Sequence, residues 1–92
     1  MSKIIAHRGA SGYAPENTMP AFEMALDMNA EGIELDVHTT KDGEVVVIHD
    51  HTIDRTSDGE GLVGGFTLDE LRKFDYGSWY GDEFKGVTIP TL

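Results

Sequence analysis

An α/β fold is predicted by three features of the sequence. Short apolar runs at 4–6, 33–37 and 45–48 are nearly continuous in hydrophobicity, as strands buried on both faces are. A helical pattern separates the first two runs, and such a strand–helix–strand unit is normally parallel and right-handed. Each run also ends at a polar cluster, and in chain order the three clusters are His7-Arg8, Glu34-x-Asp36 and His49-Asp50. In barrels of alternating strands and helices, chemistry gathers at the carboxyl ends of strands, so the three clusters are expected to converge.

The first helix is expected to begin at Asn17 or Thr18, either of which can cap it. Pro20 is tolerated in the first turn because the amide that proline lacks would be unpaired there anyway. We expect the helix to end near 29–32. An apolar stripe against the sheet is predicted from residues at i, i+3 and i+4 spacing, which are Phe22, Ala25 and Leu26.

The second and third apolar runs are joined by a polar segment without a helical pattern. Asp42-Gly43 between apolar runs is a strong hairpin signal. If these are the two turn residues, an antiparallel register places Asp36 opposite His49. A parallel third strand is equally open, because 38–44 could carry the chain back at about 3.3 Å per residue. Either path brings the third polar cluster near the second.

Residues 51–92 are predicted to form a small region that follows the barrel part at 1–50. Thr67-Leu68-Asp69-Glu70 has the pattern of a capping box and predicts a short helix to about Phe74. We expect the aromatic side chains after it to form a local core beneath a long loop, with a substrate wall as the alternative. These aromatic residues are Tyr76, Trp79, Tyr80 and Phe84.

Composition excludes several classes of partner. The formal charge of −10, from 17 acidic and 7 basic residues, argues against nucleic acid or an anionic membrane as the main partner. No apolar run is long enough for a signal peptide or a membrane span, and a cytoplasmic protein is the default expectation. A complete eight-stranded α/β barrel needs roughly 250 residues, so we expect these 92 residues to be the front third of a longer chain.

Five side chains at the strand ends suit metal-assisted attack on a phosphate ester. Glu34 and Asp36 are two residues apart on a strand, so they share a face and could hold a hard cation, with plain solvent exposure as the alternative. His7 and His49 each follow an apolar strand and could act as general base and general acid. Arg8 offers a fork of donors to phosphate oxygens, although an ion pair would use it equally well. The other polar residues nearby are Asp50, expected to orient or cap a loop, and His38, His51 and Arg55, which receive no role.

A set of motifs in this order and spacing closely resembles the glycerophosphodiester phosphodiesterases. The motifs are Ile5-Ala6-His7-Arg8-Gly9-Ala10, Pro15-Glu16-Asn17-Thr18, Glu34-Leu35-Asp36-Val37, Thr40-Lys41-Asp42-Gly43, Val46-Val47-Ile48-His49-Asp50 and Ile89-Pro90-Thr91-Leu92. They extend over nearly the whole chain. The resemblance implies a TIM-type (β/α)8 barrel whose first strands and helix lie in 1–50, with 51–92 as a small insertion.

The resemblance also implies an activity, namely hydrolysis of a small-molecule glycerophosphodiester to glycerol 3-phosphate and an alcohol with a divalent cation, Mg²⁺ or Ca²⁺. His7 and His49 would be the acid/base pair, Arg8 would bind phosphate, and Glu34 with Asp36 would supply two metal ligands. The family's third metal carboxylate and a nearby lysine lie on a later strand, beyond residue 92. We therefore expect the chain alone to be inactive, and its unpaired strand edges to favour self-association.

Two other functions compete with this interpretation. The short length favours a non-catalytic acidic module that binds a divalent cation or a partner surface and performs no chemistry. A related phosphodiesterase acting on inositol or sphingoid lipids would keep the paired histidines but have a different loop after Arg8. The run Pro15-Glu16-Asn17-Thr18 argues against that second alternative.

Overall fold

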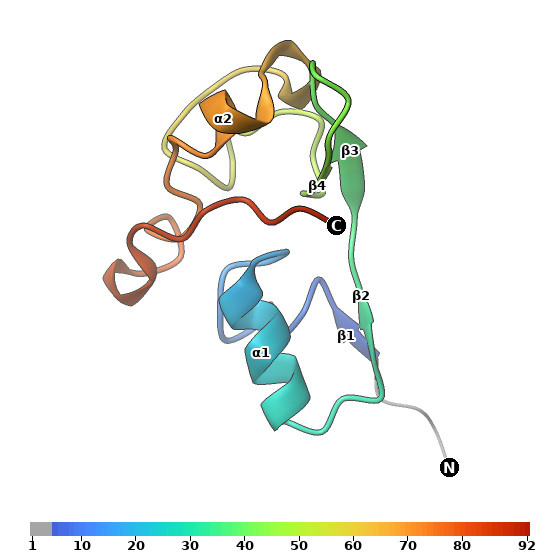
Figure 1. Cartoon of the computed structure of the whole chain (residues 1–92). Helices are drawn as coiled ribbons and strands as arrows, with labels where there is room; N and C mark the ends of the chain where they lie inside the picture. The colour runs from blue at the N-terminus through green and yellow to red at the C-terminus, as the bar shows by residue number, and fades with distance from the viewer. Residues whose placement is uncertain (1–4) are drawn as a thin grey trace.

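Two small sheets, one in each half of the molecule, organise the computed structural model, which describes residues 5–92 (Figure 1). β1 (Ile5–His7) pairs in parallel with β2 (Gly32–Glu34), and α1 (Met19–Asp27) connects the two strands. β3 (Val37–Thr39) and β4 (Val45–Val47) form the second, antiparallel sheet. The predicted parallel strand–helix–strand unit is therefore confirmed. No helix in the described part of the chain is long and apolar enough to cross a membrane.

The first helix begins where the sequence predicts, but its cap and its buried face differ from the prediction. Thr18 is the N-cap residue, yet its hydroxyl donates to the carbonyl of Pro15 at 2.6 Å and does not cap the helix. Ala21 and Ala25 form the buried face because the loop after β1 packs on Ala21. Leu26 was predicted to face the sheet, and this is wrong, since Leu26 is 63% exposed.

Gly9 allows the loop after β1 to touch the backbone of α1. Its φ is +80°, and a Cβ atom at this position would lie 2.8 Å from the carbonyl carbon of Ala21. The amide of Ala10 donates to the Ala21 carbonyl at 2.9 Å, which holds the loop against the helix. Only glycine combines this left-handed backbone with so close an approach.

Replacing Gly9 with alanine is expected to lower the free energy of unfolding by about 2 kcal/mol or more, because a left-handed alanine and an overpacked contact each cost about 1 kcal/mol or more. The measurement is urea unfolding of the chain followed by circular dichroism. Gly12→Ala in the same loop is the matched control, since a Cβ there meets no atom within 4 Å. Equal losses in the two variants would contradict the close contact with α1.

The hairpin of β3 and β4 resolves the open choice between an antiparallel and a parallel third strand in favour of the antiparallel one. Val37 pairs with Val47, a register that leaves a loop of three residues, 41–43, where two were expected. The amide of Gly43 donates to the Thr40 carbonyl at 3.1 Å, and Gly43 has a φ of +84°. A turn followed by a left-handed glycine is the common form of a three-residue hairpin loop.

This extra loop residue moves the predicted partners by one position. Asp36 was expected opposite His49, and this is wrong, because the Ile48 amide donates to the Asp36 carbonyl at 2.8 Å. The run at 33–37 was also predicted as one strand. It is instead divided at residues 35–36, where the chain leaves β2 and enters β3.

Burial of the strands on both faces is a second prediction that is wrong for much of the chain. Ile5 on β1 is 55% exposed and Val37 on β3 is 43% exposed. The reason is that each sheet has only two strands within residues 5–92, which leaves strand edges and part of a face uncovered. Val46 and Val47 on β4 are buried, as expected.

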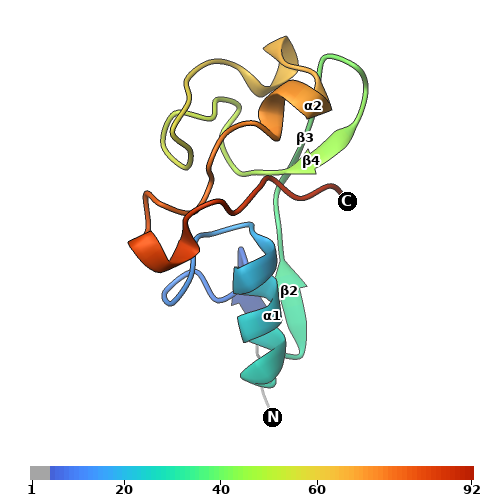
Figure 2. The same ribbon diagram turned by 60° about the vertical axis from the view of Figure 1, so that its left-hand side comes forward.

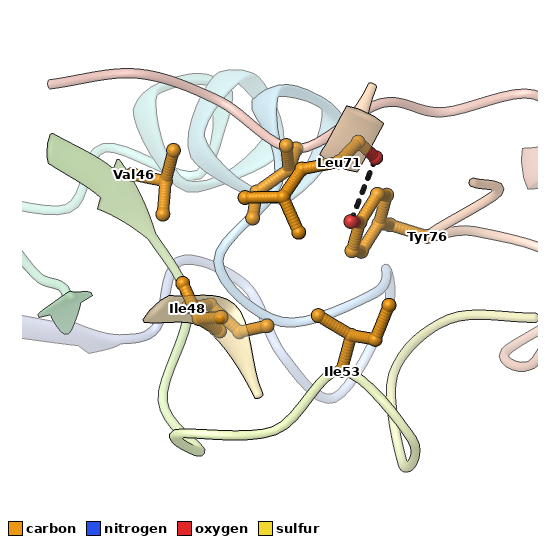
Figure 3. Packing of buried hydrophobic residues seen from close by; sticks show 7 residues of the cluster. Val46, Ile48, Ile53, Leu71 and Tyr76 are labelled. Carbon is orange, nitrogen blue, oxygen red and sulfur yellow. Dashed lines mark hydrogen bonds between the residues drawn. The ribbon is translucent and has the colours of Figure 1, made fainter. Parts of the chain in front are cut away.

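The hydrophobic core lies between β4 and the region after residue 50 (Figure 3). Its buried members are Val46, Ile48, Ile53, Val63, Leu71, Tyr76 and Ile89. The Tyr76 hydroxyl donates to the Leu71 carbonyl at 2.8 Å, which satisfies a polar group in the core. The segment at 89–92 runs beside β4, where the Val47 amide donates to the Pro90 carbonyl at 2.9 Å (Figure 2).

The elements around this core are short. The 3₁₀ helices are η1 (Val63–Gly65) and η2 (Asp82–Phe84), and α2 (Leu68–Leu71) is a single helical turn. The predicted capping box is confirmed, because Thr67 and Glu70 each accept a hydrogen bond from the other's amide. The helix ends at Leu71, before the predicted Phe74.

Only one ring of the predicted aromatic core belongs to the main core, and that ring is Tyr76. Tyr80 packs edge-to-face against Trp79 and Phe84, with ring centroids 5.8 and 5.6 Å apart. Trp79 remains 40% exposed. The aromatic residues after α2 are therefore divided between the core and a separate surface stack.

Candidate active site

Parallel pairing of β1 and β2 brings the first two polar clusters together at the carboxyl ends of the strands. His7 is the last residue of β1 and lies opposite Glu34, the last residue of β2. The Nε2 atom of His7 is 3.5 Å from Oε1 of Glu34. The sequence prediction that these strand ends converge is confirmed for this pair.

Arg8 turns the chain sharply after β1 and directs its guanidinium toward two carboxylates. Its φ is +57°, its amide donates to the Glu34 carbonyl at 2.7 Å, and its carbonyl accepts from the Asn17 amide at 2.9 Å. Nε lies 3.4 Å from Oδ2 of Asp36, and Nη1 lies 3.4 Å from Oε2 of Glu16. Among residues 5–92, Nε has no hydrogen bond beyond this ion-pair contact with Asp36, and Nη1 donates to Glu16.

Asn17 positions Asp36, a role that the sequence prediction of a helix cap missed. Its side-chain amide donates to Oδ2 of Asp36 at 3.0 Å, and its side-chain carbonyl accepts from the Asp36 amide at 3.4 Å. Burial raises the pKa of Asp36, but the Asn17 hydrogen bond and the charges of His49 and Arg8 hold that pKa below its usual value. Asp36 is therefore a carboxylate at neutral pH.

The third cluster, after β4, is held by residues to which the sequence assigned no catalytic role. Asp50 was expected to orient or cap a loop, and in the structure its Oδ1 atom lies 2.8 Å from the Nδ1 atom of His49. Arg55 received no role, yet it donates to Asp50 at 3.0 and 3.2 Å and to both carboxylate oxygens of Glu16 at 2.8 and 2.9 Å. The Nε2 atom of His38 lies 2.8 Å from the His49 carbonyl and donates to it.

Alternating charges connect the strand ends into one network. Its members, each in contact with the next, are Asp36, Arg8, Glu16, Arg55, Asp50 and His49. His49 also lies close enough for its charge to lower the pKa of Asp36. No direct ion pair or hydrogen bond joins His7 to His49 among residues 5–92. His49 ends the network at Asp50, whereas His7 contacts Glu34, which lies beside Asp36 at the other end.

The carboxylates at the end of β2 fit a hard cation. Oε1 of Glu34 is buried and makes no hydrogen bond among the described residues, although Nε2 of His7 lies 3.5 Å from it, so the oxygen could accept a cation. The Glu34 carboxyl lies close enough to Asp36 to influence the pKa of Asp36. No group of three or more His, Cys, Asp or Glu side chains suited to a metal lies within residues 5–92. Mg²⁺ is commonly held by one or two carboxylates together with water and substrate phosphate.

Comparisons with known proteins identify the family to which the chain belongs. Residues 7–92 match the model of the glycerophosphoryl diester phosphodiesterase family. The chain is 65% identical over 89 residues to a putative glycerophosphodiester phosphodiesterase of Bacillus subtilis, and 57% identical over 89 residues to a glycerophosphodiester phosphodiesterase of Caldanaerobacter subterraneus. Each match covers 97% of this chain but 37% of the relative, so the chain spans little more than a third of the relatives' length.

Solved structures of the same family resemble the chain closely. The whole chain superposes on 40% of a glycerophosphodiester phosphodiesterase from Agrobacterium tumefaciens with a TM-score of 0.97 and 49% identity. It also superposes on 37% of an Oleispira antarctica phosphodiesterase, in complex with the product sn-glycerol-3-phosphate, with a TM-score of 0.96 and 44% identity. The resemblance stated from the motifs is thereby confirmed, and the chain belongs to the glycerophosphoryl diester phosphodiesterase family.

Proposed function

We propose that this chain supplies the acid/base and phosphate-binding part of an enzyme that hydrolyses glycerophosphodiesters to glycerol 3-phosphate and an alcohol. The observation that carries the proposal is the charge network that joins Asp36 to His49 within a chain matching the family over residues 7–92. The sn-glycerol-3-phosphate bound as product by the Oleispira antarctica relative supports a glycerol phosphate as the recognised group. Residues 1–50 would be the first part of a TIM-type barrel, and 51–92 its insertion.

The residues of this chain divide the chemistry between them. Arg8 would donate guanidinium N–H groups to a phosphate oxygen. His7 and His49 would transfer protons, one toward the attacking hydroxyl and the other toward the leaving alkoxide. Glu34 and Asp36 would hold a divalent cation, which would stabilise negative charge on the phosphate when bound.

The proposal is tested with a completed enzyme, in which residues 1–92 are joined to the remaining part of the Bacillus subtilis relative that is 65% identical. With glycerophosphocholine and Mg²⁺, phosphorus NMR is expected to show glycerol 3-phosphate formed by the completed enzyme and none formed by the isolated chain. The relative itself is the positive control. A folded completed enzyme that forms no product, beside an active relative, would contradict the proposed function.

A further inference from the structure

Arg55 holds two distant carboxylates at once. It meets Glu16, which lies 39 residues earlier in the loop before α1, through two parallel hydrogen bonds, and it meets Asp50 through two more. The hydrogen bonds to Arg55 lower the pKa of Glu16, and those to Arg55 and His49 lower the pKa of Asp50 to about 2. Glu16 and Asp50 are therefore ionised at neutral pH.

An ionised Asp50 determines which nitrogen of His49 carries the proton. A carboxylate only accepts hydrogen bonds, so the Nδ1 atom of His49, 2.8 Å away, must be the donor. The neutral imidazole is then the Nδ1–H tautomer, and Nε2 keeps its lone pair for proton transfer. The carbonyl of the same residue accepts a hydrogen bond from His38, so both the ring and the backbone of His49 are held.

Stability alone is a weak explanation for this arrangement. Ion pairs on a protein surface contribute little to folding, and the Arg55 side chain is 46% exposed. However, Glu16 is only 10% exposed, and Arg55 grips it with paired hydrogen bonds that fix direction as well as distance. Paired hydrogen bonds of this kind fix the orientation of the two side chains relative to each other. Arg55 therefore ties the His49 loop to the loop that carries Arg8.

We infer that Arg55 and Asp50 are positioning residues for His49: Arg55 anchors Asp50 to Glu16, and Asp50 holds the His49 ring in the Nδ1–H tautomer. The consequence for catalysis rests on the proposed function, whereas the tautomer is a property of the chain itself. An ordering of this kind resembles the way in which a carboxylate orients the histidine of a hydrolytic triad.

The tautomer is measured by two-bond ¹H–¹⁵N NMR with ¹⁵N-labelled histidine, at about pH 8.5 where imidazoles are neutral. Spectra are recorded on the chain and on the completed enzyme. If a substitution destabilises one of these two proteins, the other still reports the tautomer. We expect Nδ1–H at His49 in the parent and its loss in Asp50→Ala. Arg55→Gln is expected to reduce the Nδ1–H population, and Arg55→Lys to restore part of it. A parent His49 with its proton on Nε2 would overturn the inference.

Activity of the completed enzyme gives the second readout. Asp50→Ala and Arg55→Gln are each expected to lower kcat about 10- to 100-fold, as the loss of an orienting partner usually does, with KM within about threefold. Because Arg55 acts through Asp50, the double variant is expected to lose no more than the worse single variant. Additive losses would contradict action through a common partner.

Arg72→Gln is the matched control, since the Arg72 side chain is exposed and makes no ion pair or side-chain hydrogen bond with residues 5–92. It is expected to leave both the tautomer and kcat unchanged. If Arg55→Gln matched this control in both readouts, the positioning role would be wrong. If the completed enzyme proved inactive, the NMR experiment would still decide the tautomer, so failure of the proposed function and failure of this inference are distinguishable.

Discussion

Alanine at His49 or His7 is expected to lower kcat/KM of the completed enzyme at least about a hundredfold, since acid/base catalysis by a positioned side chain contributes roughly that much or more. His49 ends the charge network at Asp50, and His7 contacts Glu34 beside the other end, so we expect each histidine to serve a separate proton transfer. The measurement is the initial rate of glycerol 3-phosphate release at several substrate concentrations.

The double variant distinguishes shared from separate roles. If the histidines serve one reaction as acid and base, removing both is expected to cost little more than removing one. His51→Ala is the control, because His51 is exposed and lies two residues beyond His49 without an assigned role. The acid/base assignment would be wrong if His7→Ala or His49→Ala kept a rate within about threefold of the parent. Such a loss is far smaller than the rate enhancement that a general acid or base usually contributes.

Removal of the divalent cation is expected to abolish activity of the completed enzyme. The physical reason is that the buried Oε1 atom of Glu34 makes no hydrogen bond among residues 5–92, and Asp36 is held ionised beside it. Glu34→Gln replaces one ligand oxygen with a neutral amide and is expected to raise the cation concentration for half-maximal rate about 10-fold or more. Cation binding is measured separately by calorimetry with Mg²⁺ and with Ca²⁺.

Glu34→Gln is the more informative of the two carboxylate variants, because Asp36→Asn would also disturb Arg8 and Asn17. Glu23→Gln, on the exposed side of α1, is the matched control and is expected to bind the cation as the parent does. Full activity in the presence of excess chelator would exclude a role for the cation.

Local sequence patterns predicted the parts of the site that depend on neighbouring residues. Parallel strand ends brought His7 and Glu34 together, as the strand–helix–strand pattern indicated. The hairpin signal was correct in kind, but a third loop residue displaced His49 from Asp36 by one position. A one-residue difference in loop length is not readable from Asp42-Gly43, which suits loops of both lengths.

Long-range partners were beyond the reach of such patterns. Arg55 meets Glu16 across 39 residues, and no periodicity connects the two positions. Asn17 was predicted as a cap because its residue type is common there, whereas its side chain serves Asp36 instead. The exposed Leu26 shows the same limit, because the apolar spacing of a helix does not reveal which neighbour will cover it.

A structure of the completed enzyme with glycerol 3-phosphate and Mg²⁺ tests the convergence of the strand ends most directly. We predict that one phosphate group will contact Arg8 and lie between His7 and His49, with the cation on Glu34 and Asp36. Phosphate bound on another face of the protein, out of reach of both histidines, would contradict the account.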